Sequence, residues 1–284
     1  LLLCEAVFLT AWSGLAGAAY PEDFSAEVST IAFGSCNRHD KPQTLWKTIA
    51  EVNPDLWVWL GDIVYNDTTN MALMHDKYMS LKQNPLYSEF AARVPIIGMW
   101  DDHDYGENNS GAWYPARERS QVELLDFLDE PADSPRRRQA GVHAAYTFGP
   151  QGRQVKIILV DNRYHAERPG PQADLLGEEQ WRFLAREITN CTAQILIVGS
   201  GIEVLADQHA YEKWANFPVS RGHLLDLLQR SPARVTLLIS GDRHLHEVTR
   251  WTAPSGWNLY DVTSSGMTHS VGYGWQEENS RRVG

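Results

Sequence analysis

Short apolar runs alternate with amphipathic segments along most of the chain. Segments at 42–52, 177–188 and 222–229 carry apolar residues at helical spacing and predict helices, and 63–93 is mainly helical in pattern. The runs that predict buried strands lie at 31–34, 56–60, 95–100, 142–148, 155–161, 194–199, 235–240 and 257–262. A Gly-Pro-Gln-Gly turn between 142–148 and 155–161 predicts a hairpin. This alternation is typical of an α/β fold.

Groups that bind metals follow four of the predicted strands. They are Cys36 after 31–34, Asp62 after 56–60, Asp101, Asp102, His103 and Asp104 after 95–100, and Asp242, His244 and His246 after 235–240. Because the carboxyl ends of parallel strands meet at one edge of a sheet, we expect these side chains to gather there. Several carboxylates brought together repel one another unless cations neutralise them. The pattern therefore predicts a metal centre.

Length and charge limit the remaining possibilities. A chain of 284 residues suits one large domain, which we place at 20–284. The net charge of −11 leaves no broad basic surface, which argues against a nucleic-acid partner. We expect the one basic run, Arg136-Arg137-Arg138, to lie in a solvated loop. We expect a monomer that acts on a small molecule.

The first 19 residues predict export from the cytoplasm. They are apolar and end in small residues, as in the hydrophobic and cleavage regions of a secretory signal peptide. A buried first helix and a membrane anchor are the alternatives. Sequons at Asn66, Asn108 and Asn190 predict glycosylation in a eukaryotic secretory pathway. We therefore expect a secreted or extracytoplasmic protein with no membrane span after the signal is removed.

The mixture of ligand types predicts two or three unlike ions. Carboxylate oxygens suit Ca²⁺, Mg²⁺ or Mn²⁺, whereas imidazole and thiolate suit iron or zinc. Two neighbouring cations polarise a phosphate and generate hydroxide near neutral pH, which is a route to phosphoester hydrolysis. His103 would be the general acid, oriented by Asp104 or Asp101. The phosphoryl charge would be steadied by one of three arginines, Arg38, Arg163 or Arg243.

Five ordered motifs carry a resemblance to a known family. FGSCN, LGD, WDDHD, GDRH and TSSGMTHS, between residues 31 and 270, resemble those of the PhoD-like (alkaline phosphatase D) branch of the calcineurin-like metallophosphoesterases. The resemblance implies a four-layer α-β-β-α sandwich with two mixed sheets, and an exported enzyme. It also implies hydrolysis of phosphomonoesters or phosphodiesters at a centre holding Fe³⁺ and Ca²⁺, with Zn²⁺ or Mn²⁺ as alternatives.

The resemblance assigns roles to residues by their position in the motifs. Cys36 is similar to the thiolate ligand of the iron and Asp62 to the bridging carboxylate. The calcium ligands would come from Asp101, Asp102 and Asp104, which lie beside His103, and the last metal motif would supply Asp242 and His244.

Two positions in the ligand set stay open. The family's iron also has a tyrosine ligand. Tyr65 fits a Gly-Asp-x-x-Tyr spacing and Tyr78 fits the downstream helical position, and we favour Tyr78. His246 is either a further ligand or a packing residue.

Several alternatives remain. Cys36 and Cys191 would form a disulfide if Cys36 is not a ligand. A dedicated phosphodiesterase or phospholipase D-like enzyme is the second functional hypothesis, and the polar excursion at 105–141, which we expect to overhang the site, would decide it. A secreted binding protein that has lost catalysis is the third. We expect the remaining histidines to be ordinary surface or satisfied residues, namely His39, His75, His143, His165, His209 and His223.

Overall fold

The structure of the chain, a computed structural model, describes residues 20–272, 274–275 and 277–284. The predicted signal segment at 1–19 lies outside the described residues. The elements in chain order are β1 (Ile31–Gly34), α1 (Leu45–Glu51), β2 (Leu56–Leu60), α2 (Met71–Lys82), α3 (Pro85–Ala91), β3 (Ile96–Met99), α4 (Asp102–Tyr105), α5 (Arg117–Phe127), η1 (Pro135–Arg137), β4 (Ala144–Phe148), β5 (Val155–Val160), α6 (Glu178–Thr189), β6 (Ile195–Ser200), η2 (Trp214–Asn216), α7 (Pro218–Gln229), β7 (Val235–Ser240), β8 (His246–Thr252) and β9 (Asn258–Ser264). Each predicted strand and helix is present, with ends that differ by a few residues.

The smaller sheet carries the first half of the predicted metal motifs. Its order is β1-β2-β3, and both pairs of strands are parallel. All five residues of the central strand β2 are buried. Its sequence, LWVWL, is apolar on both faces, and a strand of this kind needs cover on both sides. The helices and the larger sheet supply that cover.

The larger sheet has the order β4-β5-β6-β7-β9-β8. Its two outer pairs, β4 with β5 and β8 with β9, are antiparallel, and the pairs between them are parallel. The prediction of two sheets and the predicted hairpin, β4–β5, are confirmed. The larger sheet is mixed as expected, whereas the smaller one is parallel in all its described pairs.

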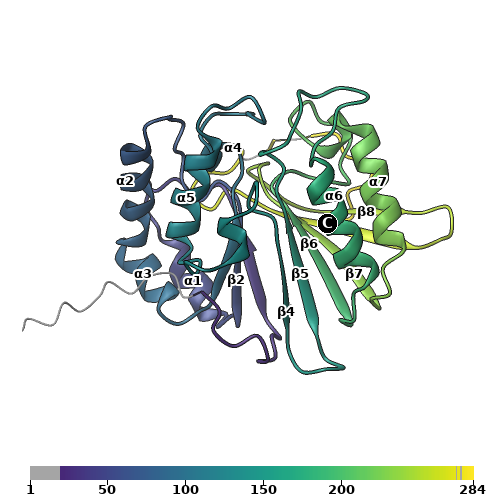
Figure 1. The fold of residues 1–284 in the computed structure, drawn as a ribbon, viewed down its shortest axis with the longest axis horizontal. Coiled ribbons are helices and arrows are strands. Elements are labelled where there is room, and N and C mark those ends of the chain that lie inside the picture. The colour runs from purple at the N-terminus through teal and green to yellow at the C-terminus, as the bar shows by residue number, and fades with distance from the viewer. Residues whose placement is uncertain (1–19, 273, 276) are drawn as a thin grey trace, which may run out of the picture.

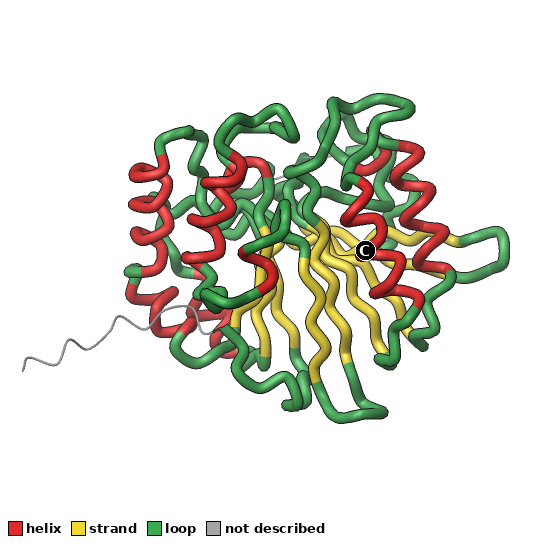
Figure 2. Tube along the Cα trace, in the orientation of Figure 1, coloured by secondary structure: helices red, strands yellow, loops and turns green. Residues whose placement is uncertain are grey.

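The layers follow the order helices, sheet, sheet, helices. Figure 1 shows α1, α2, α3 and α5 on one side of the molecule and α6 and α7 on the other. Figure 2 shows the same arrangement, with red helices flanking yellow strands. One core cluster joins the two sheets and the first set of helices, and a second lies under α6 and α7. This is the expected α-β-β-α sandwich.

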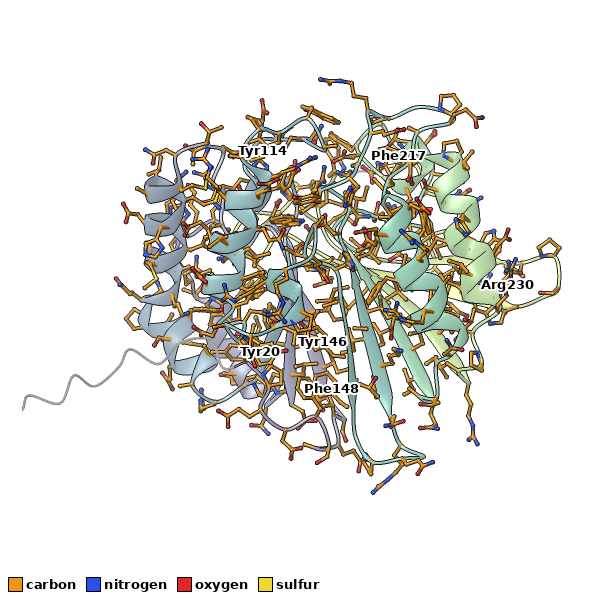
Figure 3. All side chains as sticks on the ribbon, in the orientation of Figure 1. Tyr20, Tyr114, Tyr146, Phe148, Phe217 and Arg230 are labelled. Carbon is orange, nitrogen blue, oxygen red and sulfur yellow. The ribbon has the colours of Figure 1, made fainter. Side chains whose placement is uncertain are left out.

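Aromatic side chains fill much of the first core cluster. Trp46 of α1 packs against Trp57 and Trp59 of β2 with ring centroids 5.0 and 5.4 Å apart. Each such pair adds about 0.5–1.5 kcal/mol beyond area burial. Figure 3 shows Tyr20 close to Tyr146 of β4, and their ring centroids are 6.5 Å apart. The start of the described chain is thus packed against the larger sheet.

Two features of the fold differ from the sequence prediction. Arg136, expected in a solvated loop, is buried. It donates to the carbonyls of Gly98 and Val142 at 2.6 and 2.7 Å and pairs with Glu130 at 3.2 Å. A buried guanidinium with these partners anchors the 130–142 segment to β3. The strand β8 had no predicted counterpart, because its residues are largely polar and partly exposed at the sheet edge.

None of the helices in the described part of the chain has both the length and the apolar composition to cross a bilayer.

Candidate metal centre

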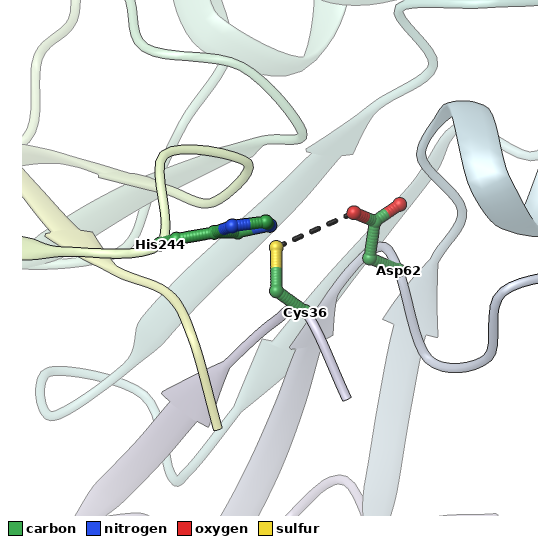
Figure 4. A group of neighbouring side chains, drawn as sticks. All are labelled: Cys36, Asp62 and His244. Carbon is green, nitrogen blue, oxygen red and sulfur yellow. Dashed lines mark hydrogen bonds between the residues drawn. The ribbon is translucent and has the colours of Figure 1, made fainter. Parts of the chain in front are cut away.

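Cys36 and Asp62 lie side by side because their strands do. β1 and β2 are adjacent and parallel, and each residue follows the end of its strand. The Sγ atom of Cys36 lies 3.3 Å from Oδ2 of Asp62. His244, which follows β7 of the larger sheet, completes the group drawn in Figure 4. The centre therefore spans the edges of both sheets.

The backbone turns sharply at these residues. The φ angles of Cys36, Asp62, Asp242 and His244 are 58°, 49°, 66° and 56°. This left-handed region is costly for residues other than glycine, and such strain gathers at functional sites. The neighbouring loops are also tightly packed, since a Cβ atom at Gly201 would lie 2.6 Å from Oδ1 of Asp101. The ligand side chains are thus held in place by the surrounding fold.

Three groups of potential ligand atoms lie in this region. They are Cys36, Asp62 and His244; Asp62, Asp102 and His103; and Asp101, Asp102 and Asp242. Within each group the ligand atoms lie within 4.8 Å of one another. Asp62 belongs to two groups and Asp102 to two, and shared carboxylates suit neighbouring cations. The arrangement suits a centre of two or three ions.

Buried negative charge is concentrated at the centre. Burial and repulsion from Asp102 raise the pKa of Asp62 well above its ordinary value. Burial and Asp102 also raise the pKa of Asp242, to about 7. Burial, followed by the charges of Asp62 and Asp242, raises the pKa of the Cys36 thiol. A bound cation would reverse these shifts.

The residues present fit a mixed-metal centre. Oδ1 of Asp62 and Oδ2 of Asp101 are buried and make no hydrogen bond with any described residue. A buried carboxylate oxygen without a donor is costly, and a cation would satisfy it. The thiol and imidazole match iron or zinc, and the carboxylates match calcium, magnesium or manganese.

Arg163 lies behind the centre and does not line its cavity. Its side chain is 1% exposed, and its Nη2 and Nη1 atoms lie 2.6 Å from Asp101 and 2.7 Å from Glu212. Burial opposes its charge, but Asp101 and Glu212 outweigh burial and raise its pKa. The expectation that Arg163 steadies the substrate is therefore corrected. It neutralises two carboxylates and leaves Oδ2 of Asp101 as the potential ligand atom.

Asp104 is occupied by hydrogen bonds. Its carboxylate accepts the backbone N–H groups of Ile63 and Val64, both at 3.0 Å, and that of Asp101 at 3.3 Å. It also accepts the Tyr78 hydroxyl at 3.3 Å. The expectations that Asp104 binds calcium or orients His103 are corrected, because its oxygens hold the loop after Asp62 against α4.

Tyr65, and not Tyr78, reaches the centre. The Tyr65 hydroxyl lies 3.1 Å from Nε2 of His244 and 3.0 Å from Nε2 of His269. Burial raises its pKa, as do the charges of Asp62 and Cys36. Tyr78 is buried against Phe127, with ring centroids 5.0 Å apart. The preference for Tyr78 is corrected, because Tyr65, which has the Gly-Asp-x-x-Tyr spacing, is the tyrosine that lies beside His244.

His103 pairs with Asp67, a residue to which the sequence analysis gave no role. Its Nδ1 lies 2.7 Å from Oδ1 of Asp67, and its ring packs on Tyr65 with centroids 4.0 Å apart. Burial disfavours the charged imidazole, but the hydrogen bond to Asp67 and the charge of Asp102 outweigh it and raise the pKa of His103. The partner of His103 is therefore Asp67, in place of Asp101 or Asp104. The sequence offered one sign of this pairing, because Asp67 is an acidic residue two positions after Tyr65.

Two further predicted residues lie at or beyond the rim. The Arg38 side chain is 42% exposed and pairs with Asp40 at 2.8 Å. Its guanidinium lies 5.8 Å from the centre of the Tyr65 ring, so it borders the site. His246 is exposed at the start of β8 and belongs to none of the ligand groups formed by the described residues. We leave it out of the ligand set.

The structure tests the disulfide alternative and the predicted glycosylation sites. Cys36 and Cys191 are both free, and Cys191 is buried in the core under α6 and α7. The disulfide alternative is therefore wrong. Asn66 is also buried, which excludes a glycan on it in the folded state, whereas Asn108 and Asn190 are exposed.

A cavity of about 630 Å³ opens over the ligands, and its lining includes Asp62, Asp102, His103, Asp242 and His244. Glu212, Tyr211 and Trp275 also line it. These three residues lie in irregular segments without a periodic pattern, so the sequence offered no signal for them. A larger cavity, of about 1150 Å³, lies near the amino ends of β1 and β2 and is lined by none of the centre's ligand groups.

Comparisons with known proteins identify the family of the chain and structures with a similar fold. A family model described as PhoD-like phosphatase matches residues 31–272. The solved structure of PhoD gives a TM-score of 0.73 at 17% identity, and the match covers 89% of this chain but only 58% of that one. A comparison with curated proteins gives no match.

Two other solved structures share the fold. A dimetal phosphatase from Danio rerio gives a TM-score of 0.58 at 14% identity, covering 86% of this chain and 89% of that one. GAP50, the anchor in the inner membrane complex of Plasmodium, gives a TM-score of 0.59 at 15% identity, covering 91% of this chain and 78% of that one. Identities this low show likeness of fold alone. The family model, however, spans most of the chain and every motif from which the centre is built. The chain belongs to the PhoD-like phosphatase family.

Proposed function

We propose that this protein is a metal-dependent phosphoesterase that hydrolyses phosphomonoesters, phosphodiesters or both outside the cytoplasm. The observation that carries the proposal is the set of three ligand groups, joined through Asp62 and Asp102, each of which contributes residues to the lining of one cavity. Family membership supports the phosphoester chemistry. The proposal of export rests on the apolar sequence of residues 1–19.

The ligand types divide the centre between unlike ions. Cys36, Tyr65 and His244 would hold Fe³⁺, with Asp62 shared between ions. The carboxylates of Asp101, Asp102 and Asp242 would hold Ca²⁺. Zn²⁺ or Mn²⁺ are the alternatives for these positions. When bound, the ions would neutralise phosphate oxygens and lower the pKa of water so that hydroxide is available near neutral pH.

The chain's own residues would manage the leaving group. His103 would donate a proton to the departing alkoxide, since the hydrogen bond to Asp67 and the charge of Asp102 stabilise its protonated form. Asp67 would hold Nδ1 and leave Nε2 as the donating atom. Arg38, the exposed arginine at the rim, would contact an outer phosphate oxygen.

Metal analysis combined with kinetics on substrates of different leaving group tests the proposal. The proteins are the wild type, Cys36→Ser, His103→Gln and, as a control, His75→Gln, whose side chain is 55% exposed and pairs with Glu123. We expect iron and calcium in the wild type and loss of iron from Cys36→Ser. For His103→Gln we expect retained metals and a rate on glycerol phosphate that is about 10²–10⁴-fold lower. The loss on p-nitrophenyl phosphate should be smaller, because p-nitrophenolate departs without a proton.

Other outcomes would reject parts of the proposal. Protein that binds iron and calcium but hydrolyses neither p-nitrophenyl phosphate nor bis-p-nitrophenyl phosphate would be a binding protein of the same fold. Protein without stoichiometric metal would reject the centre. Export predicts that protein recovered from the medium of a secreting host starts near Tyr20 by mass spectrometry. We propose that it is a monomer, which light scattering tests.

A further inference from the structure

A second group of buried ligand atoms lies next to the metal centre but shares no residue with it. It consists of Glu203 and His209, from the segment after β6, and Glu277, near the end of the described chain. The three ligand atoms lie within 4.8 Å of one another, and Nε2 of His209 is 3.0 Å from Oε2 of Glu203. The expectation that His209 is an ordinary satisfied histidine is thus corrected.

Four buried polar atoms of this group lack hydrogen bonds. The side chains of Glu203 and His209 are each 1% exposed, and that of Glu277 is 5% exposed. Both ring nitrogens of His209, Oε2 of Glu203 and Oε1 of Glu277 make no hydrogen bond with any described residue. The contact between His209 and Glu203 is close, but it does not have the geometry of a hydrogen bond. Buried polar atoms in this state are costly unless something else satisfies them.

The electrostatic environment favours a cation between the three side chains. Burial raises the pKa of Glu203 well above its ordinary value, and the charges of Glu247 and Asp261 raise it further. Burial, with the charge of Arg243, lowers the pKa of His209 to about 4. The imidazole is therefore neutral near pH 7 and offers a lone pair, which metal binding requires.

Arg243 borders the group and leaves room for an ion. It contacts Oε2 of Glu277, lies 3.8 Å from Oε2 of Glu203 and stacks 4.1 Å above the Tyr211 ring. Its guanidinium engages one oxygen of Glu277, and Oε1 stays without a donor. Lys213 adds a second positive charge near both glutamates. A divalent cation would satisfy the carboxylate oxygens and the imidazole nitrogen of this group that have no hydrogen bond.

We propose that Glu203, His209 and Glu277 bind a divalent cation of the Zn²⁺ or Mn²⁺ class at a site separate from the centre formed by Cys36 and Asp62. One imidazole and two carboxylates are a donor set that these ions accept. Two atoms 3.0 Å apart can both reach one ion at bond lengths of about 2.0–2.2 Å. The ion would tie the C-terminal segment to the loop after β6, and so hold in place the loop that carries Arg243.

Counting bound ions with the first centre disabled tests this site by itself. The parent protein carries Cys36→Ser and Asp62→Asn, and His209→Gln and His223→Gln are each added to it. His223 is exposed on α7 and stacks on Trp181 at 4.3 Å, so it is the matched control. Metal-free proteins are titrated with Zn²⁺ by calorimetry and then analysed for bound zinc after dialysis. We expect His209→Gln to bind one equivalent fewer than the parent, and His223→Gln to bind the same number as the parent.

Thermal unfolding gives a second measure of the same site. Zn²⁺ should raise the Tm of the parent by more than it raises the Tm of His209→Gln, because an ion that binds only the folded state stabilises it. Glu277→Gln, which removes a different ligand, should reproduce the loss if His209→Gln fails to fold. Equal zinc stoichiometry in the parent and in the folded ligand variant would overturn the proposal and leave a buried group that shares protons without an ion.

Discussion

Gly201→Ala is expected to destabilise the protein by about 1–3 kcal/mol and to weaken metal binding at the group containing Asp101. The added Cβ would lie 2.6 Å from Oδ1 and 2.8 Å from Cγ of Asp101, closer than such atoms approach in folded proteins. Asp101 has little freedom to move away, because Arg163 holds the same oxygen at 2.6 Å. Overpacking of this kind typically costs about 1–3 kcal/mol. The movement would also displace Oδ2, the potential ligand atom.

Gly222→Ala is the matched control. Gly222 lies inside α7, and a Cβ atom there would meet nothing within 4 Å. Because glycine costs a helix about 0.5–1 kcal/mol relative to alanine, this variant should be more stable by about that amount. Urea unfolding of the metal-free proteins measures both free energies, and calcium titration measures binding. A Gly201→Ala protein with wild-type stability and wild-type calcium affinity would refute the packing argument and the role of Asp101.

Three further predictions follow from the contacts of the centre and of one distant histidine. Tyr65→Phe should lose iron, whereas Tyr78→Phe should keep it. Tyr78→Phe should lower the free energy of unfolding by about 1 kcal/mol, because it loses the hydrogen bond to Asp104. Metal analysis and urea unfolding of both variants measure these effects, and equal iron content in the two would contradict the assignment. Asp67→Asn should lower the pKa of His103, so the alkaline fall of the pH–rate profile should start at lower pH; an unchanged profile would mean that His103 is not the acid. His143 is buried and its pKa is lowered to about 4, mainly by burial. The unfolded chain therefore binds the proton more tightly, and stability should fall from pH 6.5 toward pH 4 by up to about 3 kcal/mol. His143→Leu should flatten that part of the curve measured by urea unfolding, and an equally steep curve would assign the loss to other groups.

Local patterns were enough to place most elements of the fold. The run LWVWL at 56–60 is apolar on both faces, so it predicted a buried central strand, and the structure confirms it. The Gly-Pro-Gln-Gly turn predicted the β4–β5 hairpin for a similarly local reason. The sequence did not predict β8, because an edge strand that is largely polar has no strong apolar pattern. Arg136 was misplaced because the sequence near it does not reveal that Gly98 and Val142 offer it buried carbonyls.

The sequence also predicted the site residues that lie in motifs at the ends of strands. Cys36 and Asp62 had to be neighbours once β1 and β2 were parallel and adjacent. The choice between Tyr65 and Tyr78 was different, because both spacings were acceptable. Only the folded chain places Tyr65 beside His244 and packs Tyr78 against Phe127.

The sequence by itself determined most of the elements, the motif residues and the family, since periodicity, turn residues and strand-end motifs are properties of short segments. Tertiary structure decided which side chains meet. Arg163 is held by Asp101 and Glu212, and His209 meets Glu277, because loops that are far apart in the chain converge at one edge of the fold. Contacts between residues so far apart in the chain depend on how the sheets pack and on which groups are desolvated together. No local pattern carries that information.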